Sequence, residues 1–544
     1  MRLFNAKNRI QLKKAFMPEV RQEAPASALG WLYAAVEAGL RFAKSPRRSL
    51  MGEGNLEHLA CEELSEWGDG LGKALEYSEQ TIAPHLVLTQ NPRFMGHMTS
   101  EVHLSSQMAD ILQSFYNQNL VKQETAHGAS DIERQTVFWL HKLIYGQDAS
   151  FYEEASKDYG HSLGSTVSGG TIGNITGLTV ARNLRFPEVK QKGWQALSSL
   201  TAGPETLKVA ILASQRAHYS LLKACSLLGL GEESLVVIPV DAFTNKVSLN
   251  LMRETAKTLQ AQGTIILAIV GVAGSTETGS IDDLKELAQI AKQYGSWFHV
   301  DAAWAGAYLF SENLKPLLTG IELADSVVID GHKLMGLTMG HGMVLFRQKE
   351  SLDALLHHAH YILRTTSRDL GRFTVEGSKP FNAFKLWFTG KSIGQRGIAS
   401  RVETAHFKAQ LFLECLKAYD CFEVTSALET TILTYRYMPS WVSNLGLEED
   451  SKFGDWLSST LNHVNQEIQE FGRRDAPGFV SRTVLESVRG AKGTCTVFRA
   501  IPIHSEISES HIHALLRWQR SKGDELFAKY FKKSPFQNLL KITK

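Results

Sequence analysis

The sequence has little cysteine, little net charge and no long hydrophobic run, and each shortage excludes a class of protein. Its five cysteines are scattered and no two have C-x-x-C spacing, so neither a disulfide framework nor a metal site is indicated, and we expect the reducing cytoplasm. The 58 Lys and Arg residues nearly balance the 56 Asp and Glu residues, which gives no electrostatic case for nucleic acid. The longest apolar runs, such as 264–274, fall well short of the roughly 20 residues that span a membrane.

The stretch from about residue 160 to 347 alternates short apolar runs with helical periodicity. This alternation predicts right-handed crossovers and a mostly parallel sheet, which is an α/β architecture. The predicted strands are 209–213, 235–240, 265–270, 297–300, 326–329 and 343–346, and the predicted helices are 175–184, 221–228, 249–260 and 281–294.

The chain beyond residue 395 has a different pattern, in which longer helices accompany alternating segments. Helices are predicted at 400–418 and 454–471, and strands at 431–437 and 494–501. This mixture is typical of a smaller α+β domain. We therefore predict a helical N-terminal segment (1–90), a large domain (91–394) and a small C-terminal domain (395–544).

Polar or ionisable residues follow four consecutive predicted strands of the large domain. His218 follows the strand at 209–213, and Thr276 lies in the GVAGSTETGS segment after 265–270. Asp301 follows 297–300, and His332 and Lys333 lie in the DGHK tetrapeptide after 326–329. Because ligands of a doubly wound sheet bind beyond the carboxyl ends of its strands, we expect these side chains to share one site.

A glycine-rich stretch, SGGTIGN at 168–174, comes just before a helical pattern. Glycines let the backbone approach a ligand closely, and free N–H groups at the start of a helix attract phosphate. The stretch matches neither the dinucleotide G-x-G-x-x-G motif nor the P-loop, which disfavours a dehydrogenase. Taken alone, the stretch is better explained by a plain turn than by a phosphate site.

Each of these residues has an ordinary structural explanation by itself. Asp301 could cap a helix, Lys333 could be a solvated lysine, and His218 could be a structural histidine. Those explanations do not account for their joint occurrence at successive strand ends. A phosphate cradle, a stacking histidine, a buried aspartate and a reactive lysine are together the parts that hold pyridoxal phosphate.

These segments resemble the group II pyridoxal-dependent amino-acid decarboxylases, which include the glutamate, aromatic-amino-acid and histidine decarboxylases. The resemblance implies the fold type I of PLP-dependent transferases: a large domain with a mostly parallel seven-stranded sheet and a smaller α+β C-terminal domain. The matching segments follow the family's order and are 91–100, 168–183, 217–224, 299–306, 330–333, 369–380 and 385–397.

The resemblance also implies roles for single residues. Lys333 would bind the cofactor as a Schiff base, Asp301 would pair with the pyridinium nitrogen, and His218 would stack on the ring. Tyr361 would protonate the substrate carbon from a mobile loop, although a solvated loop tyrosine is an equal alternative. The other implied cofactor contacts are Gly170, Thr171, Gly173, Thr276, Ala303 and His332.

The segments GHMTS (96–100) and RDLGRFTVEGSKP (368–380) most resemble the bacterial aspartate 1-decarboxylase group. The reaction implied is the conversion of L-aspartate to β-alanine and CO₂, which feeds pantothenate synthesis. Glutamate is the main alternative substrate, because one methylene is worth only about 1–3 kcal/mol in a pocket. Another group II substrate, including an aromatic amino acid, is a less favoured alternative. Either acidic substrate needs a cation for its distal carboxylate, and Arg93 and Arg499 are the candidates, with Phe94 also expected near the substrate. A surface or structural ion pair is an equal alternative for each arginine.

Four positions depart from the family's usual residues without touching the four cofactor roles: Asn91, Gly331, His341 and Lys379. A protein that binds the cofactor without catalysis is the alternative from another class, and Tyr361 argues against it. The resemblance finally implies a homodimer, with the N-terminal segment packing across the interface.

Overall fold

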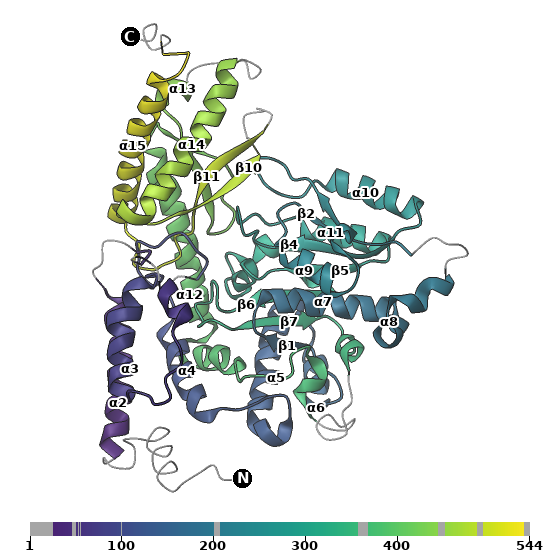
Figure 1. The fold of residues 1–544 in the computed structure, drawn as a ribbon. Coiled ribbons are helices and arrows are strands. Elements are labelled where there is room, and N and C mark those ends of the chain that lie inside the picture. Colours follow the sequence, from purple (N-terminus) through teal and green to yellow (C-terminus); the bar gives the residue numbers. More distant parts are fainter. Residues whose placement is uncertain are drawn as a thin grey trace.

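The computed structural model describes residues 25–45, 50–52, 54, 56–99, 101–200, 207–356, 368–443, 452–486 and 493–537. Its main body is a seven-stranded sheet covered by helices, and a four-stranded sheet lies at one end of the molecule (Figure 1). The predicted α/β fold with a smaller C-terminal α+β domain is confirmed. None of the helices within the described ranges has the length and apolarity needed to cross a membrane.

The large sheet has the strand order β1-β7-β6-β5-β4-β2-β3. Neighbouring strands from β3 to β6 are parallel, whereas β7 is antiparallel to both β1 and β6. The six predicted strands correspond to β2–β7, and β1 is an addition to the prediction. The strands are β1 (Gly164–Val167), β2 (Val209–Ser214), β3 (Leu235–Ile238), β4 (Ile265–Val272), β5 (Trp297–Asp301), β6 (Ser326–Asp330) and β7 (Gly342–Phe346).

Helices cover both faces of this sheet, which explains why its strands are apolar runs. Successive residues of β2 point to opposite faces: Ile211 packs in one cluster with Leu178, and Leu212 packs in another with Leu287. The helices of the N-terminal segment and large domain are α2 (Pro25–Ala43), α3 (Leu71–Tyr77), α4 (Leu104–Tyr116), α5 (Gln123–Tyr145), α6 (Ala149–Lys157), α7 (Gly170–Arg185), α8 (Pro187–Lys192), α9 (Ser220–Leu227), α10 (Leu249–Ala261) and α11 (Leu284–Gln293).

The small sheet is antiparallel throughout and has the strand order β10-β11-β9-β8. A second hydrophobic core joins it to helices α14 and α15. Its strands are β8 (Phe422–Val424), β9 (Leu433–Tyr437), β10 (Ser481–Glu486) and β11 (Thr494–Ala500), and its helices are α13 (Ser440–Ser443), α14 (Lys452–Asp475) and α15 (Glu509–Lys532).

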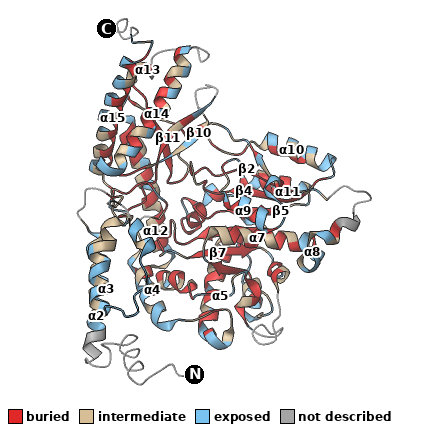
Figure 2. Cartoon of the chain, in the orientation of Figure 1, coloured by how far each residue is buried: buried red, intermediate tan, exposed pale blue. Residues whose placement is uncertain are grey.

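Helix α12 (Ala383–Lys417) connects the two parts of the molecule. Gly394 interrupts its helical dihedral angles with φ 67°, a value in the left-handed region that favours glycine. The predicted limit between the large and small domains falls at this residue. Figure 2 shows buried residues along the strands and α7, whereas α2, α3 and α4 carry many exposed residues.

Candidate active site

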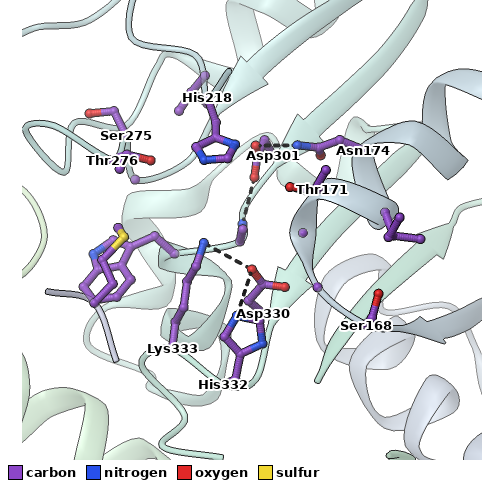
Figure 3. A pocket seen from close by; sticks show the side chains of 18 of the residues that line it. Ser168, Thr171, Asn174, His218, Ser275, Thr276, Asp301, Asp330, His332 and Lys333 are labelled. Carbon is purple, nitrogen blue, oxygen red and sulfur yellow. Dashed lines mark hydrogen bonds and ion pairs between the residues drawn. The ribbon is translucent and has the colours of Figure 1, made fainter. Parts of the chain in front are cut away.

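A cavity of about 350 Å³ lies at the carboxyl ends of the strands of the large sheet (Figure 3). The segments that line it follow β1, β2, β4, β5 and β6, which is where a doubly wound sheet binds its ligand. Most of the cofactor residues predicted from the sequence are among its lining residues. These are Gly170, Thr171, His218, Thr276, Asp301, Ala303, His332 and Lys333.

The N-terminus of α7 forms one wall of the cavity. The first N–H groups of a helix have no partners inside the helix, so they suit an anion. Gly170 begins the helix where a side chain would not fit, because a Cβ there would lie 2.8 Å from Oδ2 of Asp330. This wall can therefore hold a phosphate group close to the backbone.

Gly173 does not line the cavity, although the sequence predicted it in the phosphate turn. It lies in the first turn of α7, where a Cβ would be 2.9 Å from both methyl groups of Val328 on β6. The structure thus explains this glycine by the close packing of the helix on the sheet.

The carboxylate of Asp301 is fixed at the end of β5 by two donors. Nδ2 of Asn174 donates to Oδ2 at 2.8 Å, and the backbone N–H of Ala303 donates to Oδ1 at 3.1 Å. The side chain is 8% exposed, and Figure 3 shows it beside His218, facing the cavity. Asp301 can therefore receive a cationic group of a ligand in a defined direction.

A buried histidine supports the amide that holds Asp301. His299 lies behind Asn174, with Nε2 at 3.0 Å from the Asn174 oxygen and Nδ1 at 2.7 Å from the hydroxyl of Ser326. Burial lowers the pKa of His299 to about 4, while the nearby Asp301 charge opposes that shift. The imidazole is thus neutral at physiological pH, and its Nε2–H orients the amide.

Lys333 extends its amine into the same cavity (Figure 3). Its Nζ lies 3.1 Å from Oδ2 of Asp330, a side chain that is 3% exposed. The other oxygen of Asp330 has no hydrogen-bond partner within the described part of the chain. The lysine is thus held beside the α7 N-terminus by a buried carboxylate.

Two histidines flank the lysine. Nδ1 of His332 donates to the carbonyl of His341 at 2.8 Å, which leaves its Nε2 facing Asp330 at 3.7 Å. Nδ1 of His218 accepts from the N–H of Ser220 at 3.2 Å, so its ring is fixed above the cavity. Burial lowers the pKa of both rings, and nearby carboxylates oppose it. Neutral rings suit contact with an aromatic ligand.

Arg499 on β11 is not among the residues that line the cavity, although its charge acts on the same histidine, His97, as that of Lys333. It is 8% exposed, Nη1 donates to Oγ of Ser481 at 3.2 Å, and Nε has no partner among the described residues. Burial lowers the pKa of Arg499 to about 10, opposed by Glu277. After burial, the charges of Arg499 and Lys333 lower the pKa of His97, so that ring lies near both cations.

Comparison with known proteins identifies the chemistry of this arrangement. Residues 54–438 match the family described as the pyridoxal-dependent decarboxylase conserved domain. The chain belongs to this family. An aspartate 1-decarboxylase of Aliivibrio fischeri is 40% identical to the present chain over 430 residues, which cover 78% of each protein.

Two further comparisons agree with the family and its fold. A cysteine sulfinic acid decarboxylase of Mus musculus is 27% identical over 424 residues, which cover 77% of this chain and 81% of that relative. The crystal structure of mouse CSAD in its apo form has a TM-score of 0.79 at 23% identity and covers 92% of this chain and 99% of its own. The two relatives are named for different substrates, so the family fixes the reaction class alone.

The residues of the cavity fit pyridoxal phosphate, the cofactor of this family. The α7 N-terminus offers N–H groups where a Cβ on Gly170 would collide with Asp330, and the Lys333 amine opens into the same space. Asp301 presents a fixed carboxylate to a protonated ring nitrogen. These groups match the phosphate, the aldehyde and the pyridine nitrogen of the cofactor.

Arg93 and Phe94, which the sequence analysis expects near the substrate, are not among the residues that line this cavity. Nε of Arg93 donates to the side chain of Asn91 at 3.2 Å. Phe94 is 4% exposed and stacks on Phe479 with ring centroids 5.3 Å apart. The ring belongs to a hydrophobic core, which accounts for its place in the motif. Tyr361 lies outside the described residues.

Sequence reasoning assigned no role to three residues that line the cavity. Asn174 ends the SGGTIGN stretch, Asp330 begins the DGHK tetrapeptide, and Arg216 precedes His218 by two residues. All three residues thus lie in or beside the sequence segments that already pointed to the site. The partners of Asn174 and Arg216 come from distant segments, so only the fold reveals what these two contact, whereas Asp330 pairs with Lys333 inside the tetrapeptide.

Proposed function

We propose that this pyridoxal-phosphate-dependent amino-acid decarboxylase acts on L-aspartate and releases β-alanine and CO₂. The observation that carries the proposal is Arg499, a buried guanidinium with one hydroxyl partner and an Nε without a partner in the described chain. Burying an uncompensated cation is costly, so this group suits an anionic ligand such as a substrate carboxylate. The 40% identity to the Aliivibrio fischeri aspartate 1-decarboxylase supports the same substrate.

The proposed roles of the cavity residues follow from their positions. Lys333 attaches the cofactor covalently, the α7 N-terminus binds its phosphate, and Asp301 pairs with its ring nitrogen. His218, which lines the same cavity, would lie against the face of the cofactor ring. The cofactor, when bound, accepts the electron pair that remains on the substrate carbon after CO₂ leaves. The residue proposed to protonate that carbon is Tyr361, on the resemblance alone.

The proposed substrate orientation places the distal carboxylate on Arg499. A bidentate guanidinium contact would satisfy the Nε and a terminal nitrogen together. Glutamate is the second candidate, because an additional methylene changes the fit by only about 1–3 kcal/mol. Both candidates require an anion site, whereas an aromatic substrate would leave Arg499 buried without a counter-ion.

The test is a decarboxylation assay of the cofactor-loaded enzyme with aspartate, glutamate, cysteine sulfinate and an aromatic amino acid side by side. We expect CO₂ release with the highest kcat/KM for aspartate. A preference for the aromatic substrate would refute the acidic-substrate proposal. Cofactor binding without CO₂ release from any of the four would favour the non-catalytic alternative.

We further propose that the enzyme is a cytoplasmic homodimer. The five cysteines all lie in described residues and form no disulfide, which suits a reducing compartment. Exposed apolar side chains on α2 and α4 offer a surface for a second copy of the chain.

A further inference from the structure

A second arginine, Arg216, lines the same cavity but differs from Arg499 in its partners. It follows β2 and is 5% exposed. Its Nε donates to Oδ1 of Asn245 at 2.8 Å, Nη1 donates to Oε2 of Glu277 at 2.9 Å, and Nη2 contacts Oε2 of Glu486. Every nitrogen of this guanidinium therefore has a protein partner.

The two carboxylates on Arg216 come from different parts of the molecule. Glu277 directly follows Thr276 in the loop after β4, and Glu486 ends β10 of the small sheet. Nε2 of Gln215 also donates to Oε1 of Glu486 at 2.5 Å. Two carboxylates already neutralise the Arg216 guanidinium and occupy its donors, so Arg216 does not suit a substrate carboxylate. We therefore look for the function of Arg216 in the position it gives to Glu277 and Glu486.

Glu277 lies close to Arg499 because both reach the same face of β10. Oγ1 of Thr483 donates to Oε1 of Glu277 at 3.2 Å, and Oγ of Ser481 accepts from Arg499. Residues two apart on a strand point to one side and are separated by roughly 7 Å. The Glu277 charge also acts on the pKa of Arg499, against the lowering by burial. Glu277 is thus a carboxylate close to a guanidinium whose Nε has no partner among the described residues.

We propose that Arg216 is a positioning residue that keeps Glu277 from pairing with Arg499, so that Arg499 stays available to the substrate carboxylate. This inference rests on the proposed function. Glu277 and the substrate compete for one cation, and a carboxylate fixed in the protein competes at high effective concentration. Arg216 removes that competitor by forming an ion pair with Glu277. Contacts with Asn245 and Glu486 in turn fix the position of the Arg216 guanidinium.

If the ion pairs of Arg216 served only to join the two sheets, mutation of Arg216 would have a different effect. Loss of those ion pairs would loosen β10 and β11 together and would not be repaired by a change at Glu277. Competition for Arg499, in contrast, ends when the competing charge is removed. A double-mutant cycle between residues 216 and 277 therefore separates the two explanations.

The experiment measures kcat and KM for aspartate in cofactor-loaded wild type, R216M, E277Q, R216M/E277Q and R499M. In R216M we expect KM to rise about tenfold to a hundredfold, the range for one charge-assisted hydrogen bond, with a smaller change in kcat. Adding E277Q should lower KM far more in the R216M background than in wild type. Additive effects of the two substitutions would overturn the inference.

Failure of the inference and of the proposed function give different results. An unchanged KM in R499M would refute Arg499 as the carboxylate site, and with it the basis of the inference. A raised KM in R499M without recovery in R216M/E277Q would refute the inference alone. If R216M does not fold, R216K and R216K/E277Q replace it, and recovery of KM by E277Q is again required.

Discussion

At the scale of single residues, the cavity depends on side chains that stand behind the ones facing it. Asp301 is held by Asn174, which is oriented by His299, a ring that burial keeps neutral. Lys333 is held by Asp330 at 3.1 Å. The reacting groups are thus fixed before any ligand arrives, which reduces the reorganisation that catalysis requires.

The first prediction concerns Lys333. Replacing it with alanine removes the amine that opens into the cavity, so we expect loss of the visible absorbance of lysine-bound cofactor and loss of CO₂ release. The matched control is Lys223→Ala on α9, which removes an exposed lysine that does not line the cavity and should retain both signals. Full turnover in Lys333→Ala would contradict the assignment.

Sequence patterns predicted the residues that face the cavity better than those that support them. Asp301, Lys333 and His218 stand out because each is polar and follows an apolar strand. Asn174 ends the glycine-rich stretch and contacts Asp301, 127 residues away, and Arg216 contacts Glu486, 270 residues away. A local pattern carries no information about such distant contacts.

At the scale of structural elements, one buried ion pair ties α5 to β1 and to the segment before α12. Nζ of Lys379 lies 2.9 Å from Oε1 of Glu133, and both side chains are 2% exposed. The same amine donates to Oγ of Ser165 and to the carbonyl of Thr166, each at 2.6 Å. Lys379 is one of the positions that depart from the family's usual residue, and here it satisfies three acceptors at once.

The second prediction is that Lys379→Met destabilises the protein by about 3–5 kcal/mol, because it leaves Glu133 as an uncompensated buried charge. The measurement is the free energy of unfolding in urea. Lys157→Met is the control, since Lys157 pairs with Glu153 in an exposed i,i+4 bridge and should change stability little. Equal effects of the two substitutions would contradict the role given to burial.

Element prediction succeeded where burial on both faces produced continuous apolar runs, as in β4. It missed β1, whose sequence Gly-Ser-Thr-Val has neither a long apolar run nor alternation, although all four residues are buried. Contacts with β7 and with the helices α5 and α7 bury this strand. Its formation therefore depends on tertiary contacts, which the local sequence does not reveal. It also missed β10, whose Ser481–Glu486 sequence is mostly polar because only part of the strand is covered.

At the scale of the whole molecule, buried histidines make stability depend on pH. Burial lowers the pKa of His141 and His299 to about 4 and that of His341 to about 3. Between pH 6.5 and about 4 the unfolded chain binds protons at these sites and the folded chain does not. Each histidine therefore costs about 1.4 kcal/mol of stability per pH unit as the pH falls through this window.

One buried acid works in the opposite direction. Burial raises the pKa of Asp282 to about 6, so the folded chain holds this proton below pH 6 and gains stability as the pH falls towards 3.8. The loss of stability from the three histidines is larger than the gain from Asp282, so the folded protein becomes less stable in acid. The third prediction is a falling free energy of unfolding of the apoprotein between pH 6.5 and 4.5.

The measurement is urea unfolding of the apoprotein at several pH values, so that loss of cofactor does not contribute. His341→Leu should make the pH dependence shallower by about 1.4 kcal/mol per unit, because one proton-binding difference is removed. His463→Leu, at an exposed position on α14, should leave the slope unchanged. Identical slopes in His341→Leu and wild type would contradict this account.

The exposed apolar surface bears on the assembly of the whole molecule. Leu104, Met108, Ile111 and Phe115 are exposed at a spacing of four, three and four residues, which puts them on one side of α4. The other side of that helix is buried, and α2 adds exposed apolar residues in the same region of Figure 1. A contiguous apolar face of this kind is typical of a protein interface.

The last prediction is that the protein is a dimer through this face and that Met108→Lys/Phe115→Lys converts it to a monomer. In an isologous contact each new lysine is buried beside the same patch of the partner, so both its desolvation and its repulsion occur twice. Light scattering should give twice the chain mass for wild type and the chain mass for the variant. Leu227→Lys/Val237→Lys, which changes two exposed apolar residues on α9 and β3, should remain a dimer. A wild-type monomer would contradict the predicted dimer. A variant that stays dimeric would contradict the assignment of this face, because the two lysines of each chain would then have been buried at no cost.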